Sequence, residues 1–139
     1  MAHDSYDPAL IRRILTETKS IALVGASANP ARPSHHVMEF LLARGFRVTP
    51  VNPGLSGQTL LGQRVVARLA DLPEPVDMVE IFRQSDAAGG VVDEALALAQ
   101  PPRFIWMQIG VRDEASAARA EAKGVVVVMD RCPKIEIKL

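Results

Sequence analysis

Residues 20–27 read SIALVGAS, an unbroken apolar run of strand length that stops on Gly25-Ala26-Ser27. A loop with two prolines follows, and from Ser34 the apolar residues have helical spacing. A buried strand that turns at once into a helix is typical of the start of a nucleotide-binding α/β domain. Such a turn presents backbone N–H groups and the positive end of a helix dipole to an anion. We therefore expect a phosphate-bearing ligand at this turn.

Each residue of the turn has a physical reason to be there. Gly25 permits a positive φ and a close approach of the ligand, Ala26 is too small to block it, and Ser27 adds a hydroxyl donor. Arg32, which lies between the two loop prolines, would add positive charge. A second interpretation stays open, in which the same residues form a strand-to-helix turn that binds nothing.

The composition limits the classes of protein that need considering. A chain of 139 residues that is 48% hydrophobic is long enough to bury a core as one domain. Lysine plus arginine equals aspartate plus glutamate, at 16 each, so no net charge attracts nucleic acid or a membrane surface. The single cysteine, Cys132, excludes an internal disulfide and a multi-cysteine zinc site.

No segment of the sequence is typical of a targeting signal. The N-terminal residues contain no basic stretch that leads into an apolar one, and no apolar run approaches the roughly 18 residues of a membrane-spanning helix. We therefore expect a cytoplasmic protein whose partner is a small-molecule ligand.

Strand and helix patterns alternate along the chain. Strands are predicted at residues 20–24, 46–53, 77–83, 103–109 and 125–129, and helices at 8–18, 34–44, 85–99 and 113–123. Right-handed crossovers wind this order into an α/β, Rossmann-like three-layer fold, with a five-stranded parallel sheet and helices on both faces. We expect residues 1–139 to form a single domain, with residues 1–19 as an N-terminal helix packed on it.

Three further local expectations can be tested against a structure. Ser85 is predicted to cap the helix that follows it. The irregular segment 54–77 is predicted to be a crossover with one short helix around residues 66–72. The strand at 125–128 is predicted to lie at an edge of the sheet, where the alternating tail 134–139 would cover it.

Ligands of parallel α/β sheets bind outside the carboxyl ends of the strands. Besides the turn after the first strand, this rule selects the residues that follow the other strands: Asn52-Pro53, Phe82-Arg83, Gln108-Ile109-Gly110 and Asp130-Arg131-Cys132.

The sequence around the turn argues against NAD(P) and against a P-loop nucleotide. The dinucleotide fingerprint needs two more glycines after Gly25, and the acid that holds the ribose 2′-hydroxyl is replaced by Asn52-Pro53. No Gly-Lys-Ser or Gly-Lys-Thr occurs anywhere. Coenzyme A carries a phosphate on its ribose, which an acid would repel and which Arg83 could attract.

The order and spacing of several stretches resemble those of the small stand-alone CoA-binding proteins, a family whose fold is similar to the N-terminal CoA-binding domain of the succinyl-CoA synthetase alpha subunit. The matching stretches extend over nearly the whole chain from Ser20: residues 21–27, Asn29-Pro30, Arg32-Pro33-Ser34, 51–53, 69–73, Val76-Asp77, Phe82-Arg83, 106–110 and 129–136.

The resemblance implies a CoA site at the strand ends and suggests a role for each group of residues. The turn Gly25-Ala26-Ser27 with Arg32, ahead of the helix start at Ser34, would hold the diphosphate. Asn52-Pro53 and Phe82-Arg83 would surround the adenosine 3′-phosphate, and Gln108-Ile109-Gly110 would line the pantetheine side. The family is defined by binding and has no agreed reaction. We therefore expect a CoA-binding or acyl-CoA-binding protein without catalysis. The alternative is an NAD(P)-dependent oxidoreductase or another nucleotide-using enzyme on the same fold.

The sequence offers little that predicts a reaction. A CoA ligase needs a phosphorylatable histidine and a nucleotide-activating domain, whereas the three histidines here, His3, His35 and His36, have no such context. Neither a Ser-His-Asp arrangement nor a metal cluster is present. Cys132 lies at the expected ligand edge. It could form a disulfide with the CoA thiol, or it could be a small buried apolar residue.

Overall fold

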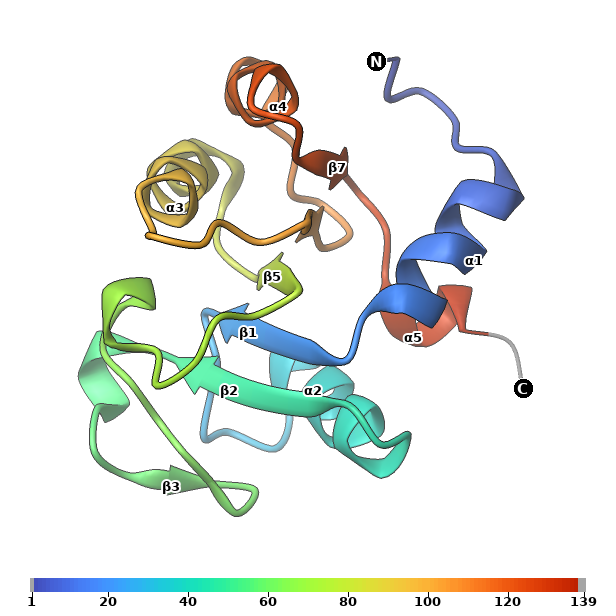
Figure 1. The fold of residues 1–139 in the computed structure, drawn as a ribbon. Helices are drawn as coiled ribbons and strands as arrows, with labels where there is room; N and C mark the ends of the chain where they lie inside the picture. Colours follow the sequence, from blue (N-terminus) through green and yellow to red (C-terminus); the bar gives the residue numbers. More distant parts are fainter. Residues whose placement is uncertain (1, 138–139) are drawn as a thin grey trace.

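The computed structural model describes residues 2–137, which form a parallel sheet between two layers of helices (Figure 1). The sheet order is β2-β1-β5-β6-β7, and every neighbouring pair is parallel. Its five strands are β1 (Ser20–Val24), β2 (Arg47–Val51), β5 (Met78–Ile81), β6 (Phe104–Met107) and β7 (Val126–Val128). The predicted five-stranded parallel sheet of a Rossmann-like fold is thus confirmed.

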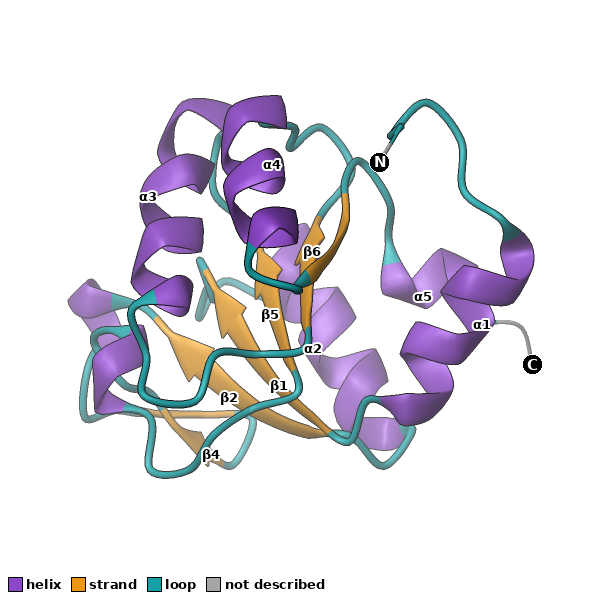
Figure 2. Cartoon of the chain, turned by 45° about the horizontal axis from the view of Figure 1, so that its top comes forward, coloured by secondary structure: helices purple, strands orange, loops and turns teal. Residues whose placement is uncertain are grey.

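The helices lie on both faces of the sheet, as the sequence predicted (Figure 2). One face is covered by α1 (Pro8–Glu17), α2 (Pro33–Ala43) and the short α5 (Pro133–Glu136), and the other by α3 (Ser85–Leu96) and α4 (Glu114–Ala122). Side chains of each strand alternate between the two faces. In β1, Ile21 and Leu23 pack in the core with α2, whereas Ala22 and Val24 pack in the core with α3. This two-sided burial explains why β1, β6 and β7 are almost entirely apolar.

The ends of the helices follow from local capping. Asp7 accepts a hydrogen bond from the Ala9 N–H at 2.9 Å, and Pro8 takes the first helical position, so α1 begins there. The prediction that Ser85 caps α3 is wrong, because Gln84 stands at that position. The Ser85 hydroxyl instead accepts from the Arg112 N–H at 2.9 Å and ties the start of α3 to the loop after β6.

The crossover between β2 and β5 departs from the prediction. Instead of a helix around residues 66–72 there is one 3₁₀ turn, η2 (Leu69–Asp71), preceded by the 3₁₀ turn η1 (Pro53–Leu55) and a hairpin of β3 (Thr59–Leu60) and β4 (Gln63–Arg64). Val66 is extended because it pairs with the outer side of β2: its N–H donates to the Pro50 carbonyl at 3.1 Å, and its carbonyl accepts from Asn52 at 2.9 Å. Pro50 is tolerated because it offers only a carbonyl on that side.

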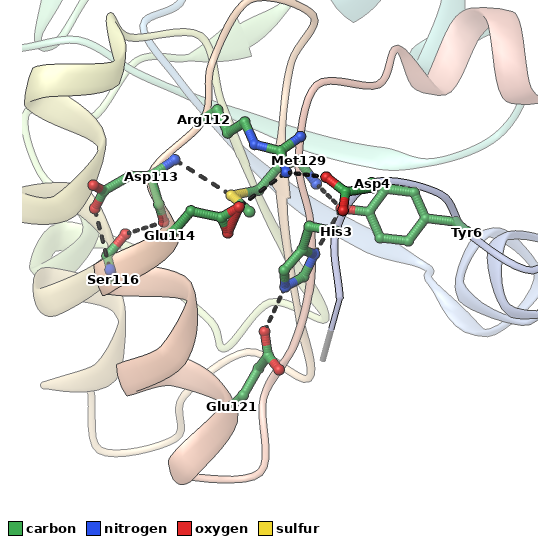
Figure 3. A network of polar contacts seen from close by, with 9 residues as sticks. All are labelled: His3, Asp4, Tyr6, Arg112, Asp113, Glu114, Ser116, Glu121 and Met129. Atoms are coloured by element: carbon green, nitrogen blue, oxygen red, sulfur yellow. Dashed lines mark hydrogen bonds and ion pairs between the residues drawn. The ribbon is translucent and has the colours of Figure 1, made fainter.

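The edge of the sheet at β7 is flanked by the N-terminal segment. The Tyr6 hydroxyl accepts from the Met129 N–H at 2.8 Å, and the His3 ring bonds to Glu121 of α4 at 2.6 Å (Figure 3). The predicted cover from the tail 134–139 is wrong for its helical part, because α5 contacts α2 instead. Residues 138–139 lie outside the described residues. Within residues 2–137, no helix has the length and apolar character needed to cross a membrane.

Candidate functional site

A crevice of about 850 Å³ opens at the carboxyl ends of β1 and β5, where the chain order of the sheet reverses. α2 leaves β1 toward one face and α3 leaves β5 toward the other, so no helix closes this point. The crevice is lined by most of the residues that the sequence selected: Gly25, Ala26, Ser27, Arg32, Ser34, Asn52, Pro53, Phe82 and Arg83.

The turn after β1 is held tightly against its neighbours. Gly25 has a φ of 93°, and a Cβ at this position would lie 2.7 Å from the Phe82 carbonyl oxygen. Glycine is therefore required both by the backbone conformation and by the approach of β5. The N–H groups of Gly25 and Ala26 donate to the Val51 carbonyl at 3.0 and 3.4 Å. These two donors hold the turn to β2 and are not available to a ligand.

The backbone N–H groups that remain free to bind an anion follow Ala26 in the chain. Among the groups of residues 2–137, none accepts a hydrogen bond from the N–H of Ser27, Ala28 or Ser34. Ser34 belongs to the first turn of α2. The N-cap residue of this helix, Arg32, makes no side-chain hydrogen bond to the helix N-terminus. Unpaired N–H groups at a helix start carry the positive end of the dipole. The Ser34 N–H at the start of α2 and the N–H groups of Ser27 and Ala28 in the preceding loop thus form a wall of donors, here named the anion-binding wall, that could hold an anion in the crevice.

Asn52 positions the turn. Its Nδ2 donates to the Ala26 carbonyl at 2.7 Å, and its Oδ1 accepts from the Gly54 N–H at 2.8 Å. Both ends of the side chain are thus occupied in joining the turn to η1. An aspartate could not make the first of these bonds, because a carboxylate has no N–H to donate. Pro53, next to it, lines the crevice.

Three arginines, Arg32, Arg68 and Arg83, line the crevice and are exposed. Arg68, which lies 3.6 Å from Asp71, was missed from the sequence because it belongs to the irregular crossover. Only its position just before the stretch 69–73 could have pointed to it. Glu94, also missed, fixes this wall by accepting from the Leu69 N–H at 2.7 Å. The exposed charge around the crevice is therefore predominantly positive.

A second hollow of about 620 Å³, here named the side hollow, adjoins the crevice and shares Pro33, Phe82 and Arg83 with it. It is also lined by Gln108, Ile109 and Cys132, whereas Gly110, Asp130 and Arg131 lie in the lining of neither hollow. The Gly110 N–H donates to the Asp130 carboxylate at 2.7 Å, which holds the loop after β6 outside the linings of both hollows.

The side hollow contains a buried polar group without a partner. Gln108 is 8% exposed, and no group within residues 2–137 donates a hydrogen bond to its Oε1. Cys132, which is 6% exposed, packs in the apolar core and also borders the side hollow.

Asp130 and Arg131 do not form an ion pair with each other. The Arg131 guanidinium instead donates to the Glu136 carboxylate at 3.2 Å.

Glu80 is a buried carboxyl that the sequence analysis overlooked. It lies in the middle strand β5, between Leu23 and Trp106 in register, and neither carboxyl oxygen has a hydrogen-bond partner within residues 2–137. Burial raises the pKa of Glu80 well above its usual range, so the fold favours the protonated form.

Among the described residues, no group of histidine, cysteine and acidic side chains is arranged to hold a metal ion.

Comparisons with known proteins show the family to which the chain belongs. A family model described as a CoA binding domain matches residues 19–138. The uncharacterised protein YneT of Bacillus subtilis strain 168 is 36% identical over 127 residues, which are 91% of each chain. A solved structure from Thermus thermophilus is 39% identical with a TM-score of 0.88, covering 94% of this chain and 96% of that one. Acetyl-coenzyme A synthetase 1 from Candidatus Korarchaeum cryptofilum is 26% identical with a TM-score of 0.65; the match covers 78% of this chain but 25% of that one.

Proposed function

Because this chain belongs to the CoA-binding domain family, we propose that it binds coenzyme A or an acyl-CoA in the crevice and does not itself catalyse a reaction. The observation that carries the proposal is the anion-binding wall of the crevice. Unpaired N–H groups and three arginines meet there at the point where the sheet order reverses. A ligand with several phosphates matches this combination of fixed donors and mobile charge.

The diphosphate is assigned to the wall formed by the turn and the start of α2. The N–H groups of Ser27, Ala28 and Ser34 supply donors in a fixed position, and Arg32 adds charge beside them. Gly25 and Ala26 serve the same wall indirectly, because their bonds to Val51 keep the turn in place.

The sheet order gives the ligand a direction. Pro53 and Arg68 lie at the β2 side of the crevice, whereas Phe82 and Arg83 lie at the β5 side, next to the side hollow. The adenosine and its 3′-phosphate are assigned to the β2 side. The pantetheine arm then extends past Phe82 toward Gln108.

Binding without catalysis is proposed because the polar side chains near the strand ends serve the backbone. Asn52, Glu94 and Asp130 each accept from a backbone N–H, and Asn52 also donates to a carbonyl. Side chains occupied in this way are suited to shaping a site more than to moving protons.

The test begins with native mass spectrometry of the protein as purified, followed by calorimetric titration with CoA and with NADH. We expect a bound mass of CoA or an acyl-CoA, and binding of CoA but not of NADH. Tight binding of NADH without binding of CoA would overturn the proposal in favour of an oxidoreductase.

A pair of charge variants tests the position of the diphosphate. Ser27→Glu places a carboxylate in the lining of the crevice and should lower CoA affinity at least about tenfold, because like charges repel at short range. Ser56→Glu is the control, since Ser56 is exposed just outside that lining. Equal affinities of the two variants would show that the diphosphate lies elsewhere.

A further inference from the structure

The lining of the side hollow is more apolar than that of the crevice. Val37, Phe82, Val111 and Cys132 form much of its lining, and Ile109 and Ile135 stand at it with 54% and 63% of their surface exposed. No other large hydrophobic side chain is exposed among residues 2–137. Exposed apolar side chains that gather around one hollow typically mark a binding site. The occupant should therefore be apolar.

The side hollow is continuous with the proposed phosphate site. Pro33, Phe82 and Arg83 belong to the linings of both, so a ligand anchored by its phosphates in the crevice reaches the side hollow without leaving the protein surface. Of the parts of an acyl-CoA, the group that lies beyond the pantetheine arm is the acyl chain. The position and the chemistry of the side hollow both correspond to this end of the ligand.

Gln108 supplies an independent sign that a ligand enters here. Its Oε1 is buried without a hydrogen-bond partner among the described residues, and the residue belongs to the lining of the side hollow. A buried acceptor of this kind is unfavourable unless something donates to it. The pantetheine arm contains two amide groups, whose N–H groups can donate to such an oxygen, and it ends where the thioester begins.

We propose that the side hollow holds the acyl group of an acyl-CoA, with the pantetheine arm passing Gln108, and that the protein binds acyl-CoA with a short apolar chain more tightly than free CoA. This inference rests on the proposed function. The chain packs against Val37, Val111 and the two exposed isoleucines. Each methylene that becomes buried strengthens binding by up to about fourfold.

The experiment compares CoA, acetyl-CoA and hexanoyl-CoA by calorimetric titration, with reductant present so that no disulfide forms at Cys132. Hexanoyl-CoA is expected to bind at least about tenfold more tightly than CoA, and acetyl-CoA to lie between them. The double variant Ile109→Ser/Ile135→Ser removes apolar surface at exposed positions, so the fold should be retained. It should remove the preference, so that hexanoyl-CoA and CoA bind the double variant with about equal affinity.

Leu15→Ser is the matched control, because Leu15 lines a different hollow near α1 and α5. It should leave the preference for hexanoyl-CoA intact. If CoA binds and hexanoyl-CoA binds no more tightly, the acyl site is overturned while the proposed function stands. A preference for hexanoyl-CoA that survives the double variant also overturns it, since the chain then lies elsewhere. If none of the three ligands binds, the proposed function itself fails.

Discussion

Arg68 and Arg83 differ in one respect that bears on which of them would meet the 3′-phosphate in the proposed complex with CoA. Both line the crevice, but only Arg83 also borders the side hollow, and Arg68 lies at the β2 side. The sequence alone pointed to Arg83. The position of Arg83 at the shared wall suits the pantetheine end, which leaves Arg68 for the adenosine end.

Binding of CoA and of dephospho-CoA to two alanine variants tests this assignment. Arg68→Ala should abolish the preference for CoA over dephospho-CoA, because the lost charge faces the phosphate that dephospho-CoA lacks. Arg83→Ala should weaken the binding of CoA and of dephospho-CoA by a similar factor, about tenfold or less. The reverse pattern would return the 3′-phosphate to Arg83.

Of the conservative substitutions in the crevice, Asn52→Asp should lower stability and CoA affinity the most. In Asn52→Asp the bond from Nδ2 to the Ala26 carbonyl is lost and two oxygens face each other. We expect the free energy of unfolding to fall by about 1–3 kcal/mol and CoA affinity to fall with it. Urea unfolding and CoA titration measure the two effects.

Asn29→Asp is the matched control, because Asn29 uses only its side-chain oxygen, which accepts from the Ala31 N–H at 3.0 Å. That bond survives the change, so stability should be nearly constant. A loss of stability equal to that of Asn52→Asp would mean that the added charge, and not the missing donor, is responsible.

Among the elements, β5 contains the least expected residue. A glutamate in a strand is normally read as facing solvent, but both faces of this central strand are covered, so Glu80 is buried. Because its pKa in the fold is raised, the unfolded chain releases the proton near the ordinary value of 4.5 while the folded chain retains it. Stability should therefore fall as pH rises from that value toward the folded pKa.

Two substitutions separate the charge of Glu80 from its polarity. Glu80→Gln should flatten this part of the pH profile, since it removes the titrating group but keeps a buried polar one. Glu80→Met should do the same and also raise stability at about pH 8 by about 1–3 kcal/mol, because no buried oxygen is left without a partner. Urea unfolding across pH gives both quantities. Identical profiles for wild type and Glu80→Gln would show that Glu80 does not titrate as described.

The elements also show where sequence reasoning works and where it stops. The strands β1, β6 and β7 are continuous apolar runs, which two-sided burial produces, whereas β5 was predicted from its alternating pattern. The extended Val66 was not predicted, because it depends on carbonyl and N–H groups at the outer side of β2, which no local pattern encodes. The hairpin, whose strands β3 and β4 pair only two residues each, was also not predicted. The same limit applies to the site. The turn after β1 and Arg83 were found at strand ends, whereas Arg68 and Glu94 lie on or against the crossover.

At the scale of the whole molecule, the charges balance, with 16 basic and 16 acidic residues, so no long-range field draws an anion to the protein. Any dependence of CoA affinity on salt must then come from the arginines at the crevice. We expect affinity to fall several-fold between about 0.05 M and about 0.5 M salt, since exposed charges are screened over ~8–10 Å at physiological ionic strength.

Arg68→Ala should make this salt dependence shallower, and Arg47→Ala, an exposed arginine outside the crevice lining, should not. Titrations at a series of salt concentrations check both. Affinity that does not change with salt would argue against ion pairing between the arginines and the ligand.

The contact between Gly25 and the Phe82 carbonyl determines how this binding site can diversify. With 2.7 Å between that oxygen and any Cβ at position 25, the floor of the crevice admits no other residue. New ligand preferences can then arise only in the walls. The crossover that contains Arg68 is bound to the sheet edge by a few hydrogen bonds and can accept insertions or new charges. Substitutions that alter the shape or charge of the crevice are therefore expected to be tolerated in its walls and to unfold or distort the turn at Gly25.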